Sequence, residues 1–482
     1  MKALTLMEIR QAVGGRALNA LPTGVKPVSV VSTDSRQVAA GSLFVALRGA
    51  KFDGHRYLAQ AAAGGAVAAI VEEAPAEEFP GLHLIGVADS RVALGRLAAV
   101  ARKALRGKVI GVAGSNGKTG TKHLIHAALS RKLRGTVSPK SFNNDIGVPL
   151  TLLPADPAAD YVVVEMGTNH RGEIRVLTKM ATPDVAVITN CGVEHLAGLG
   201  DLAGVRIENA TITEGMNERG LLVVNGDDEE LLSAVAPYRG RKITFGQKPS
   251  NDLFATDIEC GLDGVRFRLN KSRLIVFVPL LGKHTAVNAL AAIAIARRMG
   301  VAEEEVVAGL AAASGPEMRL ERSEAGGVTI INDAYNANPN SMRAALETLA
   351  ALKPAAGHLA RRVAVLGDML ELGDTTERYH REIGELAGNC GLGVLACVGE
   401  NAAHIAKAAG MSADCVMRYA DAQAAAEDVP KWLNEGDIVL LKGSRGIHLE
   451  LVARAIERRG GSGPNDSGLP RRHEGREGIQ EL

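Results

Sequence analysis

A glycine-rich turn between a strand-like run and a helical pattern constrains the fold of this chain more than any other feature. The apolar run Lys108–Ala113 leads directly into Gly114-Ser115-Asn116-Gly117-Lys118-Thr119, and a helical pattern follows. Glycines at such a corner allow backbone N–H groups to approach an anion, and the amino terminus of the helix adds partial positive charge there. The segment therefore predicts a phosphate-binding loop at the edge of a parallel sheet.

The loop departs from the usual spacing of this motif. In the common pattern Gly-x-x-x-x-Gly-Lys-Ser/Thr the first glycine would stand where this chain has Val112, and Gly111 comes one residue too early. A glycine-rich turn that binds no nucleotide is the alternative interpretation. In the nucleotide-binding interpretation, Lys118 reaches the β and γ phosphates and the Thr119 hydroxyl binds Mg²⁺. We therefore predict ATP and Mg²⁺ as cofactors.

Strand-like runs alternate with helical patterns along most of the chain. Runs at 108–113, 161–165, 185–189 and 220–225 show this alternation, which restarts after Gly327. Such alternation predicts parallel sheets with helices on both faces. The 482 residues exceed one ordinary domain of about 100 to 200 residues. We predict an α/β fold with three domains: a small α/β N-terminal domain (1–88), a central P-loop parallel-sheet domain (89–315) and a C-terminal Rossmann-like domain (316–459).

The two ends of the chain differ from its middle. Apolar runs at 28–31, 42–47 and 69–72 predict the strands of the N-terminal domain. Residues 460–482 are rich in Gly, Pro and charge without periodicity, which predicts a disordered tail. The amino end lacks the apolar core of a secretory signal, and five cysteines are scattered without metal-type spacing. We therefore expect a cytoplasmic protein with reduced thiols.

Charge and composition exclude several classes of partner. A formal net charge of +1 provides no field that would hold nucleic acid or an anionic membrane, and the 3% of aromatic residues argue against a base-stacking surface. No apolar stretch is long enough to cross a bilayer. Anions must therefore be bound locally. The sequence does not fix the oligomeric state, and a monomer is the default expectation.

Several further segments carry recognisable motifs. They are TDSR at 33–36, SLFVALRG at 42–49, DGH at 53–55, FNNDIGVPLTLL at 142–153, EMGTNHRGEI at 165–174, NDAYNANPNSM at 332–342, LGDMLELG at 366–373 and KGSR at 442–445. Together with the variant loop they resemble the Mur ligase family, which adds amino acids to the nucleotide-linked peptide precursor of the bacterial cell wall. The resemblance extends over about residues 28 to 455.

The resemblance implies a reaction and its substrates. ATP would phosphorylate the carboxylate of UDP-N-acetylmuramoyl-tripeptide, and the amino group of D-alanyl-D-alanine would then displace phosphate. Domain 1–88 would bind the UDP-sugar-peptide and domain 89–315 would bind ATP. A related ligase, such as a folylpolyglutamate synthase, and an ATP-binding homologue without ligase chemistry are the alternatives. The motifs NDAYNANP and TDSR favour the first interpretation over the second.

Candidate residues for binding ATP and metal are those that stand at the matching positions of the family's motifs. Glu165 ends an apolar run, so it should emerge at the carboxyl edge of the sheet, where nucleotide crevices form. By resemblance Glu165 is a Mg²⁺ ligand, His195 contributes to a second metal or to the activated carboxyl group, and Arg319 approaches the γ-phosphate. Asn288 would lie near adenine and Asp333 near the ribose. The alternative for Glu165 and His195 is a solvent-facing residue at a strand end, and the alternative for Asn288 is an amide on a helix surface.

Other motif residues are candidates for substrate binding. By resemblance they are Thr33, Ser35 and Arg36 for the UDP-sugar-peptide, Asn143 and Asn144 in the FNND segment, and Asn336, Asn338, Lys442, Ser444 and Arg445 for the dipeptide side. Arg36 could pair with an anionic group. The alternative for Asn336 and Asn338 is a role as turn residues, and the alternative for the segment 33–36 is a hairpin turn with a surface arginine. With Arg319 and Asp333 in the third domain, ATP would bind between domains, and domain closure is expected.

One position departs from the family pattern. Most members carry a lysine about fourteen residues after the metal-site histidine, and its carbamate helps to hold the second Mg²⁺; this chain has Asn209 there. No lysine occurs between His195 and Lys242, so a shifted alignment does not restore it. A neutral amide supplies no charge. We hypothesise that Glu208 or Glu214 compensates. Asn209 also favours the homologue without ligase chemistry.

Overall fold

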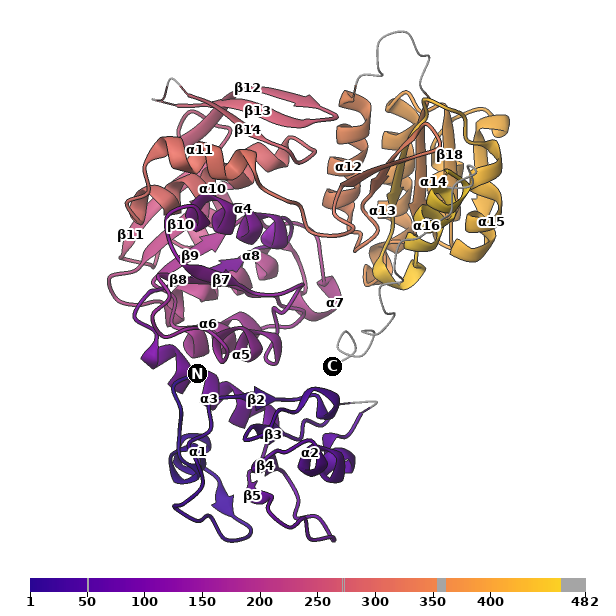
Figure 1. Cartoon of the computed structure of the whole chain (residues 1–482). Coiled ribbons are helices and arrows are strands. Elements are labelled where there is room, and N and C mark those ends of the chain that lie inside the picture. Colours follow the sequence, from indigo (N-terminus) through magenta and orange to yellow (C-terminus); the bar gives the residue numbers. More distant parts are fainter. Residues whose placement is uncertain (50–51, 271, 273, 353–360, 461–482) are drawn as a thin grey trace.

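The computed structural model describes residues 1–49, 52–270, 272, 274–352 and 361–460. They form three sheets with associated helices, and Figure 1 shows these as three domains, with the C-terminal domain beside the central one and the N-terminal domain below it. This confirms the predicted α/β class with three domains. The predicted boundaries near 88 and 315 fall between β5 and α3 and between α11 and β15. Gly460 ends α16, and residues 461–482, predicted as a tail, lie outside the described residues.

The N-terminal domain is a small five-stranded sheet in the order β1-β5-β4-β3-β2. Only β1 runs antiparallel to its neighbour. Its strands are β1 Arg16–Ala17, β2 Val31–Ser32, β3 Leu43–Val45, β4 Ala68–Val71 and β5 His83–Gly86, and its helices are α1 Leu6–Val13 and α2 Leu58–Ala63. The run predicted as a strand at 28–31 pairs only at its end, because Val28 instead bridges Leu4.

The central domain contains a nine-stranded sheet in the order β14-β13-β12-β11-β10-β9-β6-β8-β7. Its strands are β6 Lys108–Ala113, β7 Gly135–Val137, β8 Tyr161–Glu165, β9 Val185–Ile188, β10 Leu221–Asn225, β11 Arg241–Gly246, β12 Leu253–Gly261, β13 Gly264–Leu269 and β14 Ile275–Val278. The seven strands β6 to β12 are parallel to one another, and β12 to β14 form an antiparallel meander. The expected wholly parallel sheet is therefore extended by a meander that the alternation did not predict.

Helices cover both faces of the central sheet. They are α3 Ser90–Ala104, α4 Lys118–Ser130, α5 Gly147–Leu152, α6 Glu173–Ala181, α7 Leu196–Leu199, α8 Leu202–Ala210, α9 Glu229–Ala234, α10 His284–Arg298 and α11 Glu303–Ala311. Alternate residues of β6 enter different cores: Val109 packs with α3 and α6, whereas Ile110 and Val112 pack with α4 and α10. Burial on both faces explains why these strands are continuously apolar.

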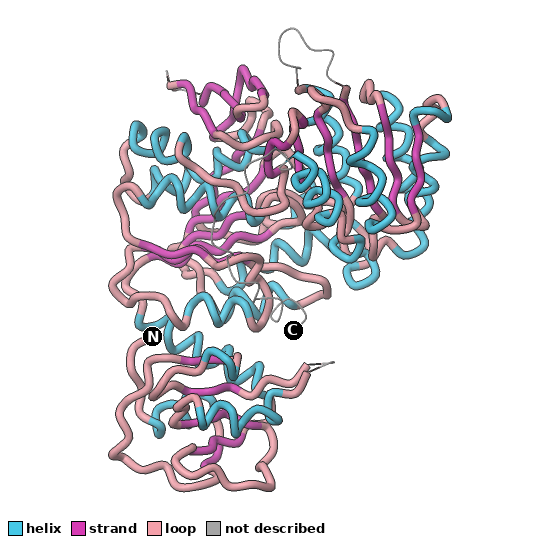
Figure 2. Tube along the Cα trace, turned by 45° about the vertical axis from the view of Figure 1, so that its right-hand side comes forward, coloured by secondary structure: helices cyan, strands magenta, loops and turns pink. Residues whose placement is uncertain are grey.

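The C-terminal domain has a six-stranded sheet in the order β15-β16-β20-β17-β18-β19, parallel except for β15. The strands are β15 Glu321–Ala325, β16 Val328–Asn332, β17 Arg362–Gly367, β18 Val394–Val398, β19 Val416–Tyr419 and β20 Ile438–Lys442. Its helices are α12 Pro339–Ala351, α13 Thr376–Asn389, α14 Ala402–Ala408, α15 Ala422–Trp432 and α16 Glu450–Gly460. Figure 2 shows the strands of this domain between helices.

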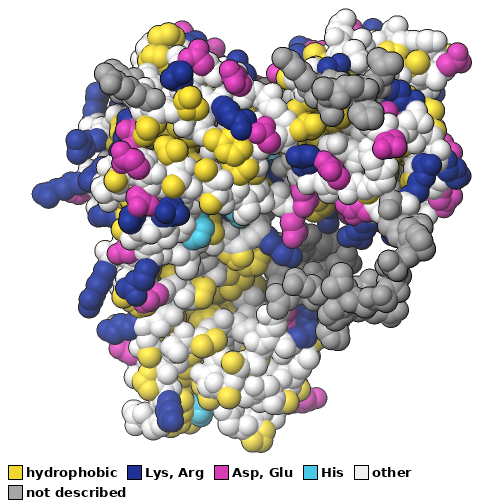
Figure 3. Space-filling model, turned by 45° about the horizontal axis from the view of Figure 1, so that its top comes forward, with side chains coloured by type: hydrophobic (Ala, Val, Ile, Leu, Met, Phe, Trp, Pro, Cys, Tyr) yellow, Lys and Arg dark blue, Asp and Glu magenta, His cyan; other side chains and the backbone are white. Residues whose placement is uncertain are grey.

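The surface fits the nearly neutral composition. On the face shown in Figure 3, basic and acidic side chains are intermixed, without a large patch of one sign. Among the described residues, no helix is both long enough and apolar enough to cross a membrane.

Candidate active site

A cavity of about 1300 Å³ lies where the three domains meet. Its lining comes from segment 30–37 of the N-terminal domain, the glycine-rich loop and β8 end of the central domain, and segment 315–345 of the C-terminal domain. In open α/β sheets, ligand crevices form outside the carboxyl ends of the strands, at the point where the strand order reverses. The cavity is therefore the candidate active site.

The glycine-rich loop adopts a conformation that requires its glycines. Gly114 has φ 127°, and a Cβ there would lie 2.1 Å from Thr189 Oγ1. Gly117 has φ 82° and closes the loop immediately before α4. The Lys118 amino group folds back over the loop and donates to the carbonyl oxygens of Gly114 and Ser115. The loop and the start of α4 thus face the cavity, and these two hydrogen bonds hold the Lys118 amino group against the loop.

The first turns of α4 place further polar groups beside the loop. Thr119 is 3% exposed, and its hydroxyl forms no hydrogen bond with any residue that the structure describes. Lys122 is completely buried, one helical turn after Lys118. Its amino group donates to Ser138 Oγ (3.1 Å) and to the Lys140 carbonyl, and it forms an ion pair with Glu165 Oε2 at 2.9 Å. Sequence reasoning missed Lys122, although its spacing from Lys118 places both on one helix face.

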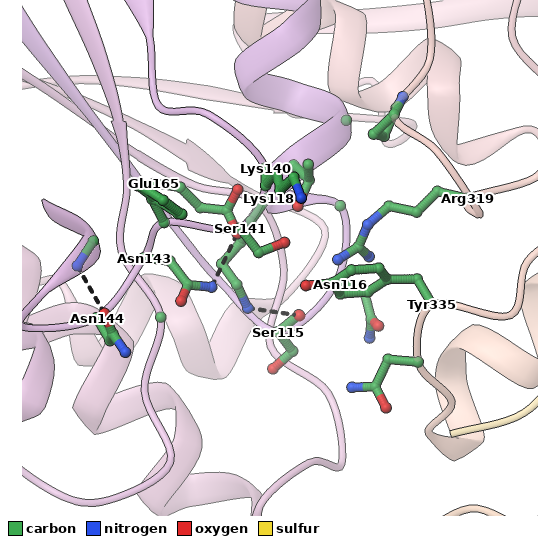
Figure 4. A pocket seen from close by; sticks show the side chains of 18 of the residues that line it. Ser115, Asn116, Lys118, Lys140, Ser141, Asn143, Asn144, Glu165, Arg319 and Tyr335 are labelled. Carbon is green, nitrogen blue, oxygen red and sulfur yellow. Dashed lines mark hydrogen bonds between the residues drawn. The ribbon is translucent and has the colours of Figure 1, made fainter. Parts of the chain in front are cut away.

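Glu165 lies at the end of β8, as predicted, but inside the protein rather than in solvent. Asn143 Nδ2 donates to Glu165 Oε1 at 3.1 Å, and Figure 4 shows both on the side of the cavity opposite Arg319. Burial acts to raise the pKa of Glu165, but the positive charges of Lys122, Arg319 and Lys118 outweigh it and hold the pKa below its ordinary value. Glu165 is therefore a charged carboxylate suited to binding a cation.

Side chains of the C-terminal domain complete the cavity. The guanidinium carbon of Arg319 lies 4.2 Å from the Tyr335 ring centroid, a cation–π contact that holds its position. Asp333 pairs with the buried Lys442 at 2.7 Å. Asn338 caps α12 and donates to Asn116 Oδ1 at 3.0 Å, so the C-terminal domain touches the glycine-rich loop directly.

His195 lies in the cavity and also contacts the C-terminal domain. Its Nδ1 is 2.7 Å from Glu371 Oε2, and Glu371 belongs to the LGDMLELG segment. A carboxylate on Nδ1 favours the tautomer whose Nε2 carries a lone pair. His195 can therefore bind a cation through Nε2 while Glu371 orients the ring.

The structure places the remaining predicted residues in two groups. Those that line the cavity are Thr33, Arg36, Ser115, Asn116, Gly117, Asn143, Asn144, Asn288, Asn336 and Lys442. Arg36 forms a two-bond pair with Asp34, and Asn144 accepts the N–H of Gly147 at the start of α5. Outside the lining are Gly114, whose carbonyl accepts from Lys118, Ser35, which donates to Gln60, Ser444, which accepts the Leu370 N–H, and Arg445, which pairs with Glu450. Their predicted contacts with substrate stay predictions.

The structure contradicts the hypothesis that Glu208 or Glu214 replaces the missing carbamate. Glu208 accepts the N–H groups of Gly172 (2.7 Å) and Ile174 (2.9 Å), so it caps α6. Glu214 pairs with Arg175 at 2.6 Å, and neither carboxylate lines the cavity. Asn209 is 1% exposed and donates to the Val205 carbonyl, while its Oδ1 has no hydrogen-bond partner among the described residues.

The capping role of Glu208 leads to a prediction about stability. Glu208→Gln should lower the free energy of unfolding by about 1 to 2 kcal/mol, because a charge-assisted cap at a helix amino terminus is lost. The Mg²⁺ concentration that gives half-maximal activity should stay the same. Urea unfolding and a Mg²⁺ titration check the two expectations, with Glu214→Gln as a control that changes neither. An increased Mg²⁺ requirement in Glu208→Gln would favour the compensation hypothesis instead.

Comparison with known proteins agrees with this geometry. Three family models match the chain: Mur ligase family, catalytic domain, at 27–102, Mur ligase middle domain at 112–296, and Mur ligase, glutamate ligase domain, at 318–445. The UDP-N-acetylmuramoyl-tripeptide–D-alanyl-D-alanine ligase of Bacillus subtilis (strain 168) is 38% identical over 430 residues, covering 88% of this chain and 92% of that protein.

Two solved structures are similar along nearly the whole chain. MurF from Acinetobacter baumannii has a TM-score of 0.85 and 32% identity, covering 95% of this chain and 99% of that one. MurF ligase from Thermotoga maritima, solved in complex with ADP, has a TM-score of 0.79 and 27% identity, covering 89% and 97%. Because the family models match all three domains and a relative above 30% identity aligns over most of its length, the chain belongs to the Mur ligase family.

Proposed function

We propose that this protein is an ATP-dependent ligase that joins D-alanyl-D-alanine to the carboxylate of UDP-N-acetylmuramoyl-tripeptide and releases ADP and phosphate. The observation that carries the proposal is one cavity in which the glycine-rich loop of the central domain faces Arg319 and Asp333 of the C-terminal domain. The similarity to the Bacillus subtilis ligase, at 38% identity, supports the choice of substrates.

The cavity has the groups that an ATP site requires. The loop N–H groups and the amino terminus of α4 would bind the phosphates, and Lys118 and Arg319 would neutralise charge on the transferred group. Asn288 lies against Gly117, since a Cβ on that glycine would be 2.8 Å from its side-chain nitrogen. Asn288 would therefore contact the nucleotide close to the loop, with Asp333 available to its ribose.

The same cavity fits divalent cations. The buried Thr119 hydroxyl without a partner, the charged Glu165 and the Nε2 of His195 are the oxygen and nitrogen donors that would hold Mg²⁺. Bound Mg²⁺ would supply positive charge beside the phosphate oxygens.

The reaction then proceeds in two balanced steps. A tripeptide carboxylate oxygen forms a bond to the γ-phosphorus while the bond to ADP breaks, which gives an acyl phosphate. The dipeptide amine next bonds to the acyl carbon, phosphate leaves and the amine loses a proton. Because the site is lined by the central and C-terminal domains, closure of these domains would exclude water that hydrolyses the acyl phosphate.

The three domains divide the substrates among them. Thr33 and Arg36 line the N-terminal side of the cavity and would bind the UDP-sugar-peptide, with Asn143 and Asn144 nearer the phosphate loop. Asn336, Asn338 and Lys442 lie on the opposite side and would orient the dipeptide. One chain contains all of these groups, so the protein would work as a monomer, in the cytoplasm where ATP is available.

The test incubates the protein with Mg-ATP, UDP-muramoyl-tripeptide and D-alanyl-D-alanine. We expect one phosphate released for each product molecule, with the product mass equal to that of both substrates minus water. Omitting the dipeptide should stop sustained phosphate release. Intact protein that binds ADP but forms no product would favour an ATP-binding homologue without ligase chemistry. A product with glutamate and a folate in place of these substrates would favour the related ligase.

A further inference from the structure

Glu194 is a buried carboxylate that lines the cavity without a partner. It precedes His195, is 8% exposed and forms neither a hydrogen bond nor an ion pair with any residue that the structure describes. An ionised carboxylate withdrawn from water costs several kcal/mol unless positive charge or donors compensate. Positive charge brought into the cavity by a ligand would therefore stabilise Glu194.

The other acidic side chains of the cavity each have a partner from the protein. The pairs are Asp34 with Arg36, Asp145 with Arg91, Glu165 with Lys122, Glu173 with the N–H groups of Asn169 and His170, and Asp333 with Lys442. Each of these carboxylates thus has at least one partner within the protein. Among the described acidic residues of the lining, Glu194 alone has none.

The segment that carries Glu194 is fixed against the phosphate loop. Ser115 N–H donates to the Asn190 carbonyl at 2.8 Å, and Gly192 N–H donates to Ser115 Oγ at 2.9 Å. Val193 N–H donates to Asn340 of the C-terminal domain at 3.1 Å. The backbone that carries Glu194 is thus held close to both the loop and the domain interface.

The chemistry of the neighbours favours a metal ion over an organic cation. The adjacent His195 offers Nε2, and a hard divalent cation prefers carboxylate oxygen. Asn209 supplies no charge, and Glu208 is committed to the cap of α6.

We propose that Glu194, next to His195, supplies the negatively charged ligand of a second divalent cation in this protein. The charged ligand would therefore come from the segment before α7 rather than from position 209 in α8. The inference rests on the proposed function, because that function brings nucleotide phosphates into the same cavity. It assigns a binding residue that the motifs did not indicate.

The test measures cation binding without catalysis. Mn²⁺ is titrated into the full chain with a saturating non-hydrolysable ATP analogue, and free Mn²⁺ is followed by electron paramagnetic resonance. We expect two classes of bound Mn²⁺ in the wild type. Glu194→Gln should weaken one class by about tenfold or more, since a charged ligand becomes a neutral one. Glu214→Gln, which makes the same chemical change outside the cavity, should match the wild type.

Two further measurements keep the result interpretable. Thermal unfolding without added cation should occur at the same or a higher temperature in Glu194→Gln than in the wild type, because the variant removes an unpaired charge, and this separates loss of a ligand from loss of the fold. Glu194→Asp keeps the charge, so it should retain the second class more tightly than Glu194→Gln. Equal weakening in both variants, identical isotherms for Glu194→Gln and wild type, or one Mn²⁺ class in the wild type would each overturn the proposal.

Failure of the proposed function would be seen separately. The Mn²⁺ titration contains neither the tripeptide nor the dipeptide, so it reports on Glu194 whether or not these are the substrates. Absence of product from the wild type, with two Mn²⁺ classes present, would reject the ligase and keep the cation site.

Discussion

Lys118→Met should reduce phosphate release by about 10³-fold or more, because the variant removes a positive charge from the transferring phosphoryl group. Positioning and charge neutralisation provide most of the catalysis in phosphoryl transfer, so loss of one of the positive charges around the phosphates should slow it strongly. Steady-state phosphate release with both substrates measures the effect.

The fold should be little affected by Lys118→Met. Among the described residues, the Lys118 amino group bonds only to two carbonyl oxygens of its own loop, and these can turn to water. Lys132→Met, just beyond the end of α4, is the matched control: the Lys132 side chain is half exposed and its amino group pairs with Glu305 away from the cavity. Activity in Lys118→Met within tenfold of the control would mean that Lys118 does not contact the phosphates.

Lys122→Met should lower the free energy of unfolding by about 3 to 5 kcal/mol. The substitution leaves Glu165 buried as an ion whose closest counter-charge has gone, and an uncompensated buried charge is among the most destabilising changes known in proteins. The methionine itself fits a buried helix position, so lost packing contributes little. Urea unfolding of the full chain, followed by far-ultraviolet circular dichroism, measures the change.

A double-mutant cycle separates the ion pair from other effects of the substitution. Lys122→Met with Glu165→Gln removes both charges, so it should be more stable than Lys122→Met alone, with a coupling energy of about 1 to 3 kcal/mol. Additive effects of the two substitutions would show that the 2.9 Å contact between Lys122 and Glu165 does not stabilise the fold.

Local patterns predicted the fold because they report local physics. The run Lys108–Ala113 forms β6 with the predicted bounds, and Tyr161–Glu165 forms β8, since continuous apolar residues can be buried on both faces of a parallel sheet. The meander β12 to β14 escaped prediction because polar and apolar residues mix along β12, which is buried only near its start. Its pairing depends on neighbours far along the chain.

The motifs indicated many of the residues that line the cavity but not how they are paired. Ser444 stands in a motif with Lys442, yet only Lys442 reaches the cavity, because Ser444 bonds to the backbone of Leu370. Glu208 fitted a metal ligand by charge and position, but its carboxylate caps α6. Which partner a side chain meets is a property of three-dimensional packing, and spacing does not encode it.

The sequence by itself determined the phosphate loop, the α/β class, the three domains and the family. Each depends on short segments whose glycines, apolar runs or motifs act locally. The tertiary structure alone decided that Lys122 neutralises Glu165, that Asn338 meets the loop at Asn116, and that Glu194 is left unpaired among the described acids of the cavity. The physical reason is that the energy of a buried charge depends on every charge and donor within a few ångströms, and folding brings these together from distant parts of the chain.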